Sequence, residues 1–334
     1  MTDTANPVLA EIWRGPLLES VHRGTAVVCR PDGEVIAAWG DPARVILPRS
    51  SCKMLQALPL VESGAAERAG LTDAHLALSC ASHQGAPVHT DLVRDWLGTL
   101  DLREPDLRCG PQTPYDDDTR FDLRQAVREG DQTHNNCSGK HCGFLTLNGH
   151  MRGGAEYIDP DHPVQQAVKQ ASAELAGEDL SDFAVDGCSA PNFAMTVRGL
   201  ATAVARFAAP QVLSGVRAQA AARLRDAMAA HPVLVAGEGR ACTALIRACE
   251  GRAVVKTGAE GVFIAILPDP GIGIALKCDD GSGRGSEAAI AALLARYGVI
   301  DKAHPVYANY ADTPLTNRRG IAHGHLRASA DLFA

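Results

Sequence analysis

Three features are missing from this chain of 334 residues: a long apolar run, an excess of positive charge and, in its first residues, the pattern typical of a secretory signal. No apolar stretch approaches the roughly 20 residues that a membrane-spanning helix needs. Acidic side chains outnumber basic ones by 39 to 32, giving a formal net charge of −7, so no basic field is available for a nucleic-acid backbone. The first residues show no basic region followed by an apolar one. We therefore expect a cytoplasmic protein without a membrane or nucleic-acid partner.

The composition is that of a globular protein with a large core. Hydrophobic residues make up 46% of the chain and charged residues 21%. The length allows two domains, or one domain with two lobes. Neither the Gly-x-Gly-x-x-Gly pattern nor a phosphate loop is present, because the Gly-rich segment 281–286 lacks the lysine and the glycine spacing of such a loop.

Strand patterns lie near both ends of the chain. Thr25–Val28 and Glu34–Ala37 flank the turn residues Pro31-Asp32-Gly33, which predicts a β-hairpin. Residues 253–256, 261–267 and 272–277 form three further short strand-like runs. Arg318, Arg319, His323, His325 and Arg327 occupy a tail for which we expect an edge strand.

Helical spacing dominates the middle. It predicts helices over 50–62, 72–79, 88–97, 121–128, 163–175, 212–229 and 243–248, and a closing helix over 286–297. The expected fold class is α+β: one antiparallel sheet built from N- and C-terminal strands, with packed helices and an inserted helical lobe. We expect residues 1–334 to form a single catalytic domain with a sheet lobe, about 8–49 and 250–334, and a helical lobe, about 50–249.

Ser50 and Lys53 form a Ser-x-x-Lys motif at the start of the first expected helix. Side chains three residues apart share a helix face, so a buried, neutral lysine amine could take the proton from the serine hydroxyl. Backbone N–H groups at the helix start could stabilise an oxyanion. The motif is common, and a capping serine beside a surface lysine is the alternative.

Two later motifs favour the catalytic interpretation. Ser82 lies in the polar segment Ser79–Gly85, and Lys256-Thr257-Gly258 ends a predicted strand. Ser-x-x-Lys, a further serine and then Lys-Thr-Gly is the order found in penicillin-recognising serine acyl-transfer enzymes. Ser82 could otherwise be only a turn-forming residue.

In a reducing compartment scattered cysteines are more often core residues, but two of the ten are candidate metal ligands. Cys137 and Cys188 lie in two separate segments expected to be loops, and with His141 or another donor they could bind a borderline ion such as zinc. They could equally be two unpaired thiols. Without an export signal we expect no disulfide, and we expect Cys52 and Cys80 to be packing residues.

Taken together, these motifs resemble the rhizobial-type L-asparaginase family, which has a fold similar to serine β-lactamases and glutaminases. The resemblance runs from about Trp13 to Tyr297 and is carried by seven ordered segments: 49–53, 80–85, 109–111, 136–141, 186–191, 256–261 and 277–281.

The resemblance implies hydrolysis of L-asparagine to L-aspartate and ammonia by a homodimer. It assigns Ser50 with Lys53 and Ser82 with Lys256 as two Ser–Lys pairs. Either serine could be the nucleophile, and we favour Ser50 for its position at the expected helix start. It places zinc on Cys137, Lys140 and Cys188, one ion per subunit that assists the reaction rather than generating the nucleophile. It makes Arg49, His141 and Asp186 residues that line the site or bind the substrate.

Two alternatives remain open from the sequence. A glutaminase or another cytosolic amidase could use the same scaffold, because one methylene in a pocket changes selectivity by only about 1–3 kcal/mol. A non-catalytic metal or thiol sensor built on Cys137 and Cys188 would belong to another class. A β-lactamase or peptidase fits less well, since their substrates lie outside the cytoplasm.

Overall fold

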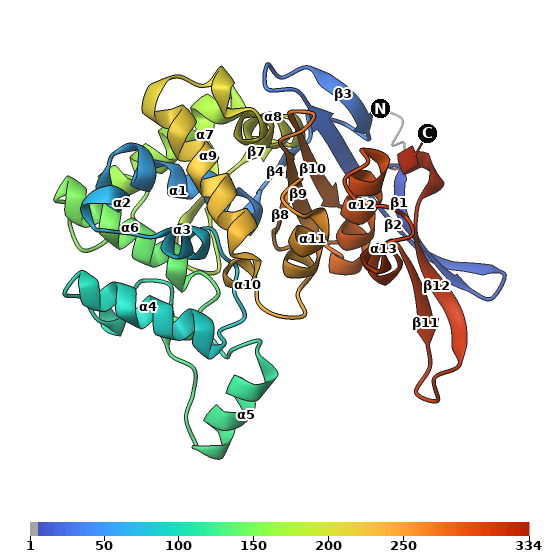
Figure 1. The fold of residues 1–334 in the computed structure, drawn as a ribbon, viewed down its shortest axis with the longest axis horizontal. Helices are drawn as coiled ribbons and strands as arrows, with labels where there is room; N and C mark the ends of the chain where they lie inside the picture. The colour runs from blue at the N-terminus through green and yellow to red at the C-terminus, as the bar shows by residue number, and fades with distance from the viewer. Residues whose placement is uncertain (1–5, 334) are drawn as a thin grey trace. The chain divides into compact units, whose positions relative to one another are not determined.

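The computed structural model describes residues 6–333, whose contacts divide them into two compact units (Figure 1). The sheet unit contains residues 6–51, 195–209 and 244–333. The helical unit contains residues 52–194 and 210–243. Whether they act as the single expected catalytic domain stays a prediction, but the expected lobe limits change. Residues 195–209, expected in the helical lobe, belong to the sheet unit, and the first boundary lies after Ser51.

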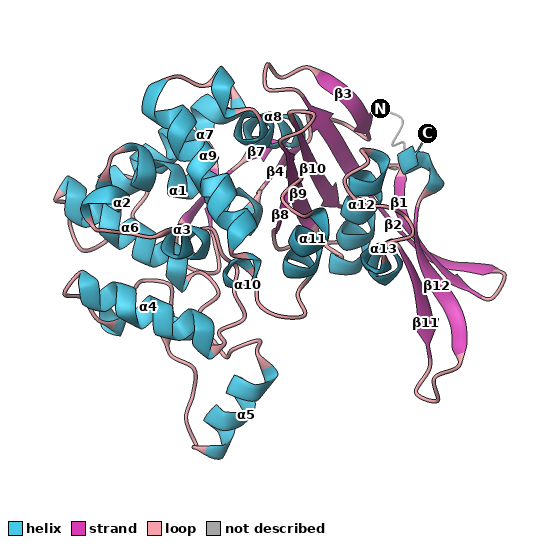
Figure 2. Ribbon diagram, in the orientation of Figure 1, coloured by secondary structure: helices cyan, strands magenta, loops and turns pink. Residues whose placement is uncertain are grey.

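The sheet unit is built around one antiparallel sheet, as predicted. Its strand order is β11-β12-β1-β2-β10-β9-β8, and β3 pairs with β2 (Figure 2). A separate short pair joins β4 and β7. The strands are β1 (Val8–Arg14), β2 (Leu17–Cys29), β3 (Val35–Trp39), β4 (Val45–Ile46), β7 (Met195–Thr196), β8 (Val254–Thr257), β9 (Val262–Leu267), β10 (Ile272–Cys278), β11 (Asp312–Thr316) and β12 (Ala322–Ala328).

Both predicted strand groups are confirmed. β2 and β3 form the N-terminal hairpin, and Gly33 adopts a φ of 90° in its turn, a backbone conformation that glycine reaches without steric cost. The C-terminal tail differs from the prediction. His323, His325 and Arg327 lie on β12, which pairs on both sides with β11 and β1, so β11 is the edge strand instead.

The core of this unit lies over β9 and β10. Every residue of β9 is buried, which requires cover on both faces because alternate side chains point to opposite sides. Helices α8 (Val197–Ala208) and α12 (Gly283–Arg296) both pack on these strands. A side chain at Gly273 of β10 would lie 2.3 Å from the backbone of α8, so glycine permits this close approach. Packing on the sheet places α8 in this unit, and the sequence analysis did not predict that helix.

The helical unit contains most of the predicted helices. In it α1 packs against α6, α7 and α9, and α3 packs against α6 and α9. Its helices are α1 (Lys53–Glu62), α2 (Ala65–Arg68), α3 (Asp73–Ser79), α4 (Pro87–Thr99), α5 (Asp117–Gln125), α6 (Ser138–Met151), α7 (Pro163–Ala176), α9 (Gly215–Ala230) and α10 (Pro232–Val235). A two-stranded sheet joins β5 (Phe183–Val185) and β6 (Pro191–Phe193).

Two further helices complete the described chain. α11 (Ala241–Cys249) crosses the last boundary between the units, and α13 (Pro305–Tyr310) precedes β11. No helix within residues 6–333 combines the length and apolar character needed to cross a bilayer.

Helix α6 departs from the sequence prediction, which treated its N-terminal segment as a loop. Its residues 138–147 are all buried. Gly139 explains how the helix fits, because a Cβ there would lie 2.4 Å from the Leu78 carbonyl oxygen of α3. Glycine thus lets the start of α6 lie directly against the end of α3.

Candidate active site

The side chain of Lys53 is buried within the helical unit, at the first position of α1. Its amine donates to the carbonyl oxygen of Ala81 and, over 3.3 Å, to that of Asn136. These carbonyls come from the segment after α3 and the segment before α6. A neutral amine has two N–H groups and one lone pair, so two acceptors would leave the lone pair available to a hydroxyl. The arrangement is compatible with Lys53 as a base.

Ser82 directly follows one of these carbonyls, in the segment after α3. Its backbone N–H donates to Val235 O at the end of α10 over 2.9 Å, and its side chain is mostly buried. The next residue, His83, donates its N–H to Asn136 O over 3.2 Å. The helical unit therefore brings the backbone next to Ser82 into contact with the Lys53 amine.

A buried cluster of two thiols and an amine lies at the start of α6. Cys137 precedes the helix, Lys140 is in its first turn, and Cys188 is in the turn between β5 and β6. The Lys140 Nζ atom lies 3.0 Å from Cys188 Sγ, and Cys137 is within hydrogen-bonding reach of Cys188. The exposed fractions are 4%, 2% and 3% in chain order. Both cysteines lie in turns, as expected, and Lys140 in the first turn of α6 brings the third donor to them.

The side chains of this cluster shift one another's pKa values. The hydrogen bond from Cys137 holds the pKa of Cys188 well below its usual range, against the effect of burial, and the charge of Lys140 lowers it further. Burial opposes the charge on Lys140, but the sulfur atoms of Cys188 and Cys137 outweigh it and raise the pKa of the lysine. Without a metal the favoured state is thus a Lys140 ammonium beside a Cys188 thiolate.

The donor chemistry of this cluster fits a zinc ion. A thiolate, a second thiol and an amine converge where a metal could replace their protons. Among residues 6–333 no group of three or more His, Cys, Asp or Glu side chains is arranged to hold a metal. The Lys140 amine, 3.0 Å from Cys188 Sγ, could serve as a third donor beside the two cysteines.

His141 and Asp186 border the cluster. Burial, followed by the charge of Lys140, holds the pKa of His141 well below its usual range, so the ring is neutral. Its Nδ1 lies 2.9 Å from the hydroxyl of Tyr157, which also accepts the Arg108 backbone N–H over 2.8 Å. Asp186 is partly exposed, and its charge contributes to the raised pKa of Lys140.

Tyr157, whose hydroxyl contacts His141, belongs to the surroundings of the cluster and was not predicted from the sequence. Its oxygen accepts from Arg108, and its own hydrogen can be donated to His141 Nδ1; in that arrangement the ring's proton lies on Nε2. That buried Nε2 lies near the Cys188 backbone and has no completed hydrogen bond among the described residues. Tyr157 stands alone between polar and turn residues, so no pattern in the sequence marks it.

The sheet unit holds Arg49, Ser50 and Lys256. Ser50 lies in a 3₁₀ turn over Arg49–Cys52, and the α-helix predicted to begin there starts at Lys53. Arg49 adopts a φ of 53°, an unusual conformation for a residue with a side chain. Such strain is found at functional sites more often than elsewhere.

Lys256 is fully buried near the end of β8, and its amine donates to Thr257 O over 2.7 Å. A Cβ at Gly258 would lie 2.7 Å from Pro48 O and 3.2 Å from the Ser51 nitrogen. The end of β8 therefore packs directly on the turn that carries Ser50. This close approach explains why a residue without a side chain occupies the third position of Lys-Thr-Gly.

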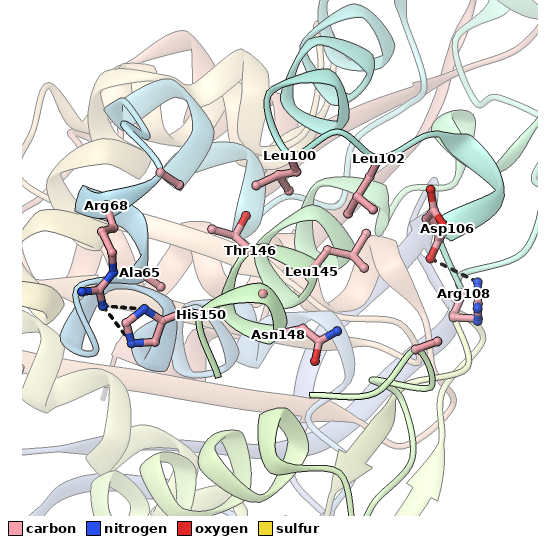
Figure 3. A pocket seen from close by; sticks show the side chains of 13 residues that line it. Ala65, Arg68, Leu100, Leu102, Asp106, Arg108, Leu145, Thr146, Asn148 and His150 are labelled. Carbon is pink, nitrogen blue, oxygen red and sulfur yellow. Dashed lines mark hydrogen bonds between the residues drawn. The ribbon is translucent and has the colours of Figure 1, made fainter. Parts of the chain in front are cut away.

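A pocket of about 480 Å³ lies elsewhere in the helical unit (Figure 3). Leu100, Leu102 and Leu145 form part of its apolar lining, and Arg68 contacts both ring nitrogens of His150 at its edge. None of the predicted site residues lines it. The hydroxyl of Thr146 in its lining donates to Cys142 O and accepts from Trp96 Nε1, so we do not assign the chemistry to this pocket.

Comparison with known protein families shows which family the chain belongs to. Residues 10–328 match the family described as L-asparaginase II. The chain belongs to the L-asparaginase II family. It is therefore an amidohydrolase, and the family resemblance noted in the sequence is confirmed. No curated protein sequence matches this L-asparaginase II family member.

Solved structures resemble this family member at low sequence identity. A β-lactamase from Mycobacterium bovis is 17% identical, with a TM-score of 0.46, and the match covers 82% of this chain and 94% of that one. A putative β-lactamase from Bacteroides dorei is 12% identical, with a TM-score of 0.42 and coverages of 78% and 86%. A protein named Mglu is 13% identical, with a TM-score of 0.47 and coverages of 84% and 66%.

Proposed function

We propose that this family member hydrolyses L-asparagine to L-aspartate and ammonia through a seryl ester intermediate. The observation that supports it most is in the helical unit. There the buried Lys53 amine contacts the carbonyl next to Ser82, and the Lys140 amine lies 3.0 Å from the Cys188 sulfur. An amidohydrolase needs a nucleophile, a base and a group that handles the ammonia proton. We assign the first role to Ser50 and both proton transfers to Lys53.

In the first half of the reaction, Ser50 Oγ attacks the side-chain carboxamide carbon of asparagine. Lys53, in its neutral form, takes the hydroxyl proton through the lone pair that its two carbonyl acceptors leave free. Backbone N–H groups of the turn at Ser50 would stabilise the oxyanion. The C–N bond then breaks, and the leaving nitrogen receives a proton from the Lys53 ammonium to depart as ammonia.

In the second half, water attacks the ester carbon and a neutral Lys53 accepts one of its protons. The ester C–O bond breaks, Ser50 recovers its hydrogen, and aspartate is released. The family's motifs assign Ser82 and Lys256 to a second Ser–Lys pair, which would relay protons or hold the substrate. Arg49, His141 and Asp186 would bind or orient the substrate, and a carboxylate such as Asp186 suits its amino group.

We further propose that Cys137, Lys140 and Cys188 hold one zinc ion per subunit. When bound, zinc supplies a Lewis-acidic centre that can orient a ligand or stabilise negative charge. The neutral Nε2–H of His141 would then lie beside the site as a hydrogen-bond donor. Ser50 and Lys53 already provide nucleophile and base, so we assign the ion an assisting role.

Finer properties of the enzyme are also proposals. Asparagine rather than glutamine as the preferred substrate follows from the family's description alone. A cytoplasmic location and a homodimer are expected from the sequence and its resemblance.

The test is ammonia release from L-asparagine and, separately, from L-glutamine. Wild type should release ammonia from asparagine, and Ser50→Ala and Lys256→Ala should each lose most of that activity. Ser214→Ala, which removes an exposed serine hydroxyl, is the matched control and should retain it. No release by wild type would refute the asparaginase proposal, and full activity of Ser50→Ala would remove Ser50 as the nucleophile. A faster rate with glutamine would make the enzyme a glutaminase.

A further inference from the structure

His83 is a fully buried histidine that the proposed chemistry does not use, although it directly follows Ser82. Its Nδ1 accepts the Gly85 backbone N–H over 3.1 Å, and its Nε2 lies 2.9 Å from Ser138 Oγ. Ser138 is the first residue of α6, next to Cys137. One side chain thus connects the Ser82 segment to the start of the helix that carries the thiol–amine cluster.

The surrounding hydrogen bonds determine the protonation of this ring. A backbone N–H can only donate, so Nδ1 must be the unprotonated acceptor. The neutral ring then carries its hydrogen on Nε2 and donates it to Ser138 Oγ. The Ser138 hydroxyl in turn donates a hydrogen bond to Thr133 O over 2.9 Å. Each donor in this series of hydrogen bonds therefore has one acceptor. Burial, followed by the charge of the nearby His89, lowers the pKa of His83 well below its usual range, which agrees with a neutral ring.

A second histidine supports the first from α4. The ring of His89 stacks on that of His83, with centroids 4.8 Å apart and an interplanar angle of 9°. Its Nε2 lies 2.9 Å from Val233 O on α10, the helix whose residue Val235 accepts the Ser82 backbone N–H. The Ser82 segment is therefore held toward α6 by His83 and toward α10 by its own N–H group.

This connection also determines the surroundings of Lys53. The two carbonyl acceptors of its amine belong to Ala81 and Asn136, one on each of the segments that His83 joins. Asn136 O also accepts the His83 backbone N–H. If the segments separated, Lys53 would lose one acceptor and Ser82 would move away from the start of α6.

We propose that His83 is a positioning residue that, as the neutral Nε2–H form, keeps Ser82 and Lys53 in place relative to the N-terminus of α6. It touches neither substrate nor reacting atoms and acts through Ser138 and the backbone. The inference rests on the proposed function for its catalytic consequence, but the geometry that it describes can be tested without any activity.

The experiment compares His83→Gln with His83→Asn. The Gln amide nitrogen can reach the position of Nε2 and keep the donor to Ser138 Oγ. The Asn amide ends near the position of Nδ1 and loses that donor. We expect His83→Asn to lower kcat for ammonia release on the order of 10- to 100-fold with KM nearly unchanged, and His83→Gln to restore most of the loss. Ser138→Ala, which removes the acceptor, should behave like His83→Asn.

Two measurements on purified protein do not depend on activity. Amide hydrogen exchange at residues 82–85 should accelerate at least several-fold in His83→Asn and Ser138→Ala, but not in His83→Gln. Nitrogen-15 NMR of wild type should show the His83 resonance as the neutral Nε2–H form, identified by its loss in His83→Gln.

The outcomes separate the two proposals. Equal exchange in all variants, or an Nδ1–H form in wild type, would overturn the positioning role even if the enzyme is an asparaginase. Equal kcat values for His83→Asn, His83→Gln and active wild type would do the same. If wild type releases no ammonia, the proposed function fails, while exchange and NMR still decide the role of His83.

Discussion

The Nζ atom of Lys140 lies 3.0 Å from the Sγ atom of Cys188, with both side chains buried in the helical unit. An unpaired buried charge is costly, so each of these groups depends on the other or on a metal that replaces their protons. Zinc requires deprotonated donors, and the thiolate state of Cys188 is already favoured here. The first prediction below, on metal content, follows from this contact.

The first prediction concerns metal content. Wild type purified from zinc-supplemented medium should contain about one zinc per chain, and Cys188→Ala should contain almost none, because it removes the favoured thiolate donor. The measurement is elemental analysis after dialysis. Cys29→Ala, which removes a buried thiol from the sheet unit, is the control and should keep its zinc. Equal zinc in wild type and Cys188→Ala would exclude Cys188 as a ligand.

The second prediction concerns Lys53. Replacement by Met keeps the side chain up to the position of Cε but removes the amine, so kcat/KM should fall by roughly 10²- to 10⁴-fold. The free energy of unfolding should also fall by about 1–3 kcal/mol, because the carbonyls of Ala81 and Asn136 lose this donor. Steady-state kinetics and urea unfolding measure the two effects. Lys169→Met on α7 is the control for loss of a lysine, and a fully active Lys53→Met would show that Lys53 is not the base.

The third prediction compares two glycines of one helix. Gly139→Ala places a methyl group 2.4 Å from Leu78 O, so we expect a loss of about 1–3 kcal/mol in the free energy of unfolding. Gly149→Ala meets nothing within 4 Å and should stabilise the protein by about 0.4–1 kcal/mol. Urea unfolding of both variants measures the difference. Equal effects would contradict the close contact between α6 and α3.

The fourth prediction concerns pH. Partial burial opposes the charge on Asp131, but hydrogen bonds from His134 and Thr133 and the charges of His134 and Arg94 outweigh it and hold its pKa well below the usual range. A carboxyl group with a lowered folded-state pKa stabilises the protein above its unfolded-state pKa of about 4, and this contribution falls as pH decreases.

Asp131→Asn should therefore cost about 1 kcal/mol at pH 7, a value reduced for solvent screening because the side chain is 36% exposed. The difference from wild type should shrink below about pH 4. Urea unfolding between pH 3 and 7 measures it. A difference that grows toward low pH would show that the sign is wrong.

The strands of the sheet could be predicted from the sequence because the patterns that mark them lie within short segments. Pro31-Asp32-Gly33 marks a turn between two strand-like runs, and the apolar stretch at 262–267 has the length of a buried strand. Most helices of the middle were found by the same periodic logic. The positions of their ends were less accurate, as for α5, which begins at Asp117 rather than near 121.

Helix α6 could not be found in this way. Residues 138–147 are buried all round, so the helix has no polar face and its sequence lacks the 3.6-residue alternation. Gly139 and Gly143 further weaken the local helix preference. Likewise, Tyr157 reaches His141 only because distant segments meet, a relationship that no local pattern contains.

The motifs located the candidate site residues, but not the atoms that orient them. Ser82, Lys53 and Cys137 stand in recognisable segments, whereas the backbone carbonyls of Ala81 and Asn136 that receive the Lys53 amine leave no mark in the sequence. Backbone acceptors are present at every residue, so only the fold selects which of them serve a side chain.

The burial of α6 has a consequence for how the protein would be made in the cell. Cys137 and Lys140 are enclosed once this helix has packed against α1, α3, α4 and α7. An ion that binds there would have to arrive while the chain is still assembling, or wait for the region to open. The supply of zinc during synthesis would then influence what fraction of the chains carries the metal.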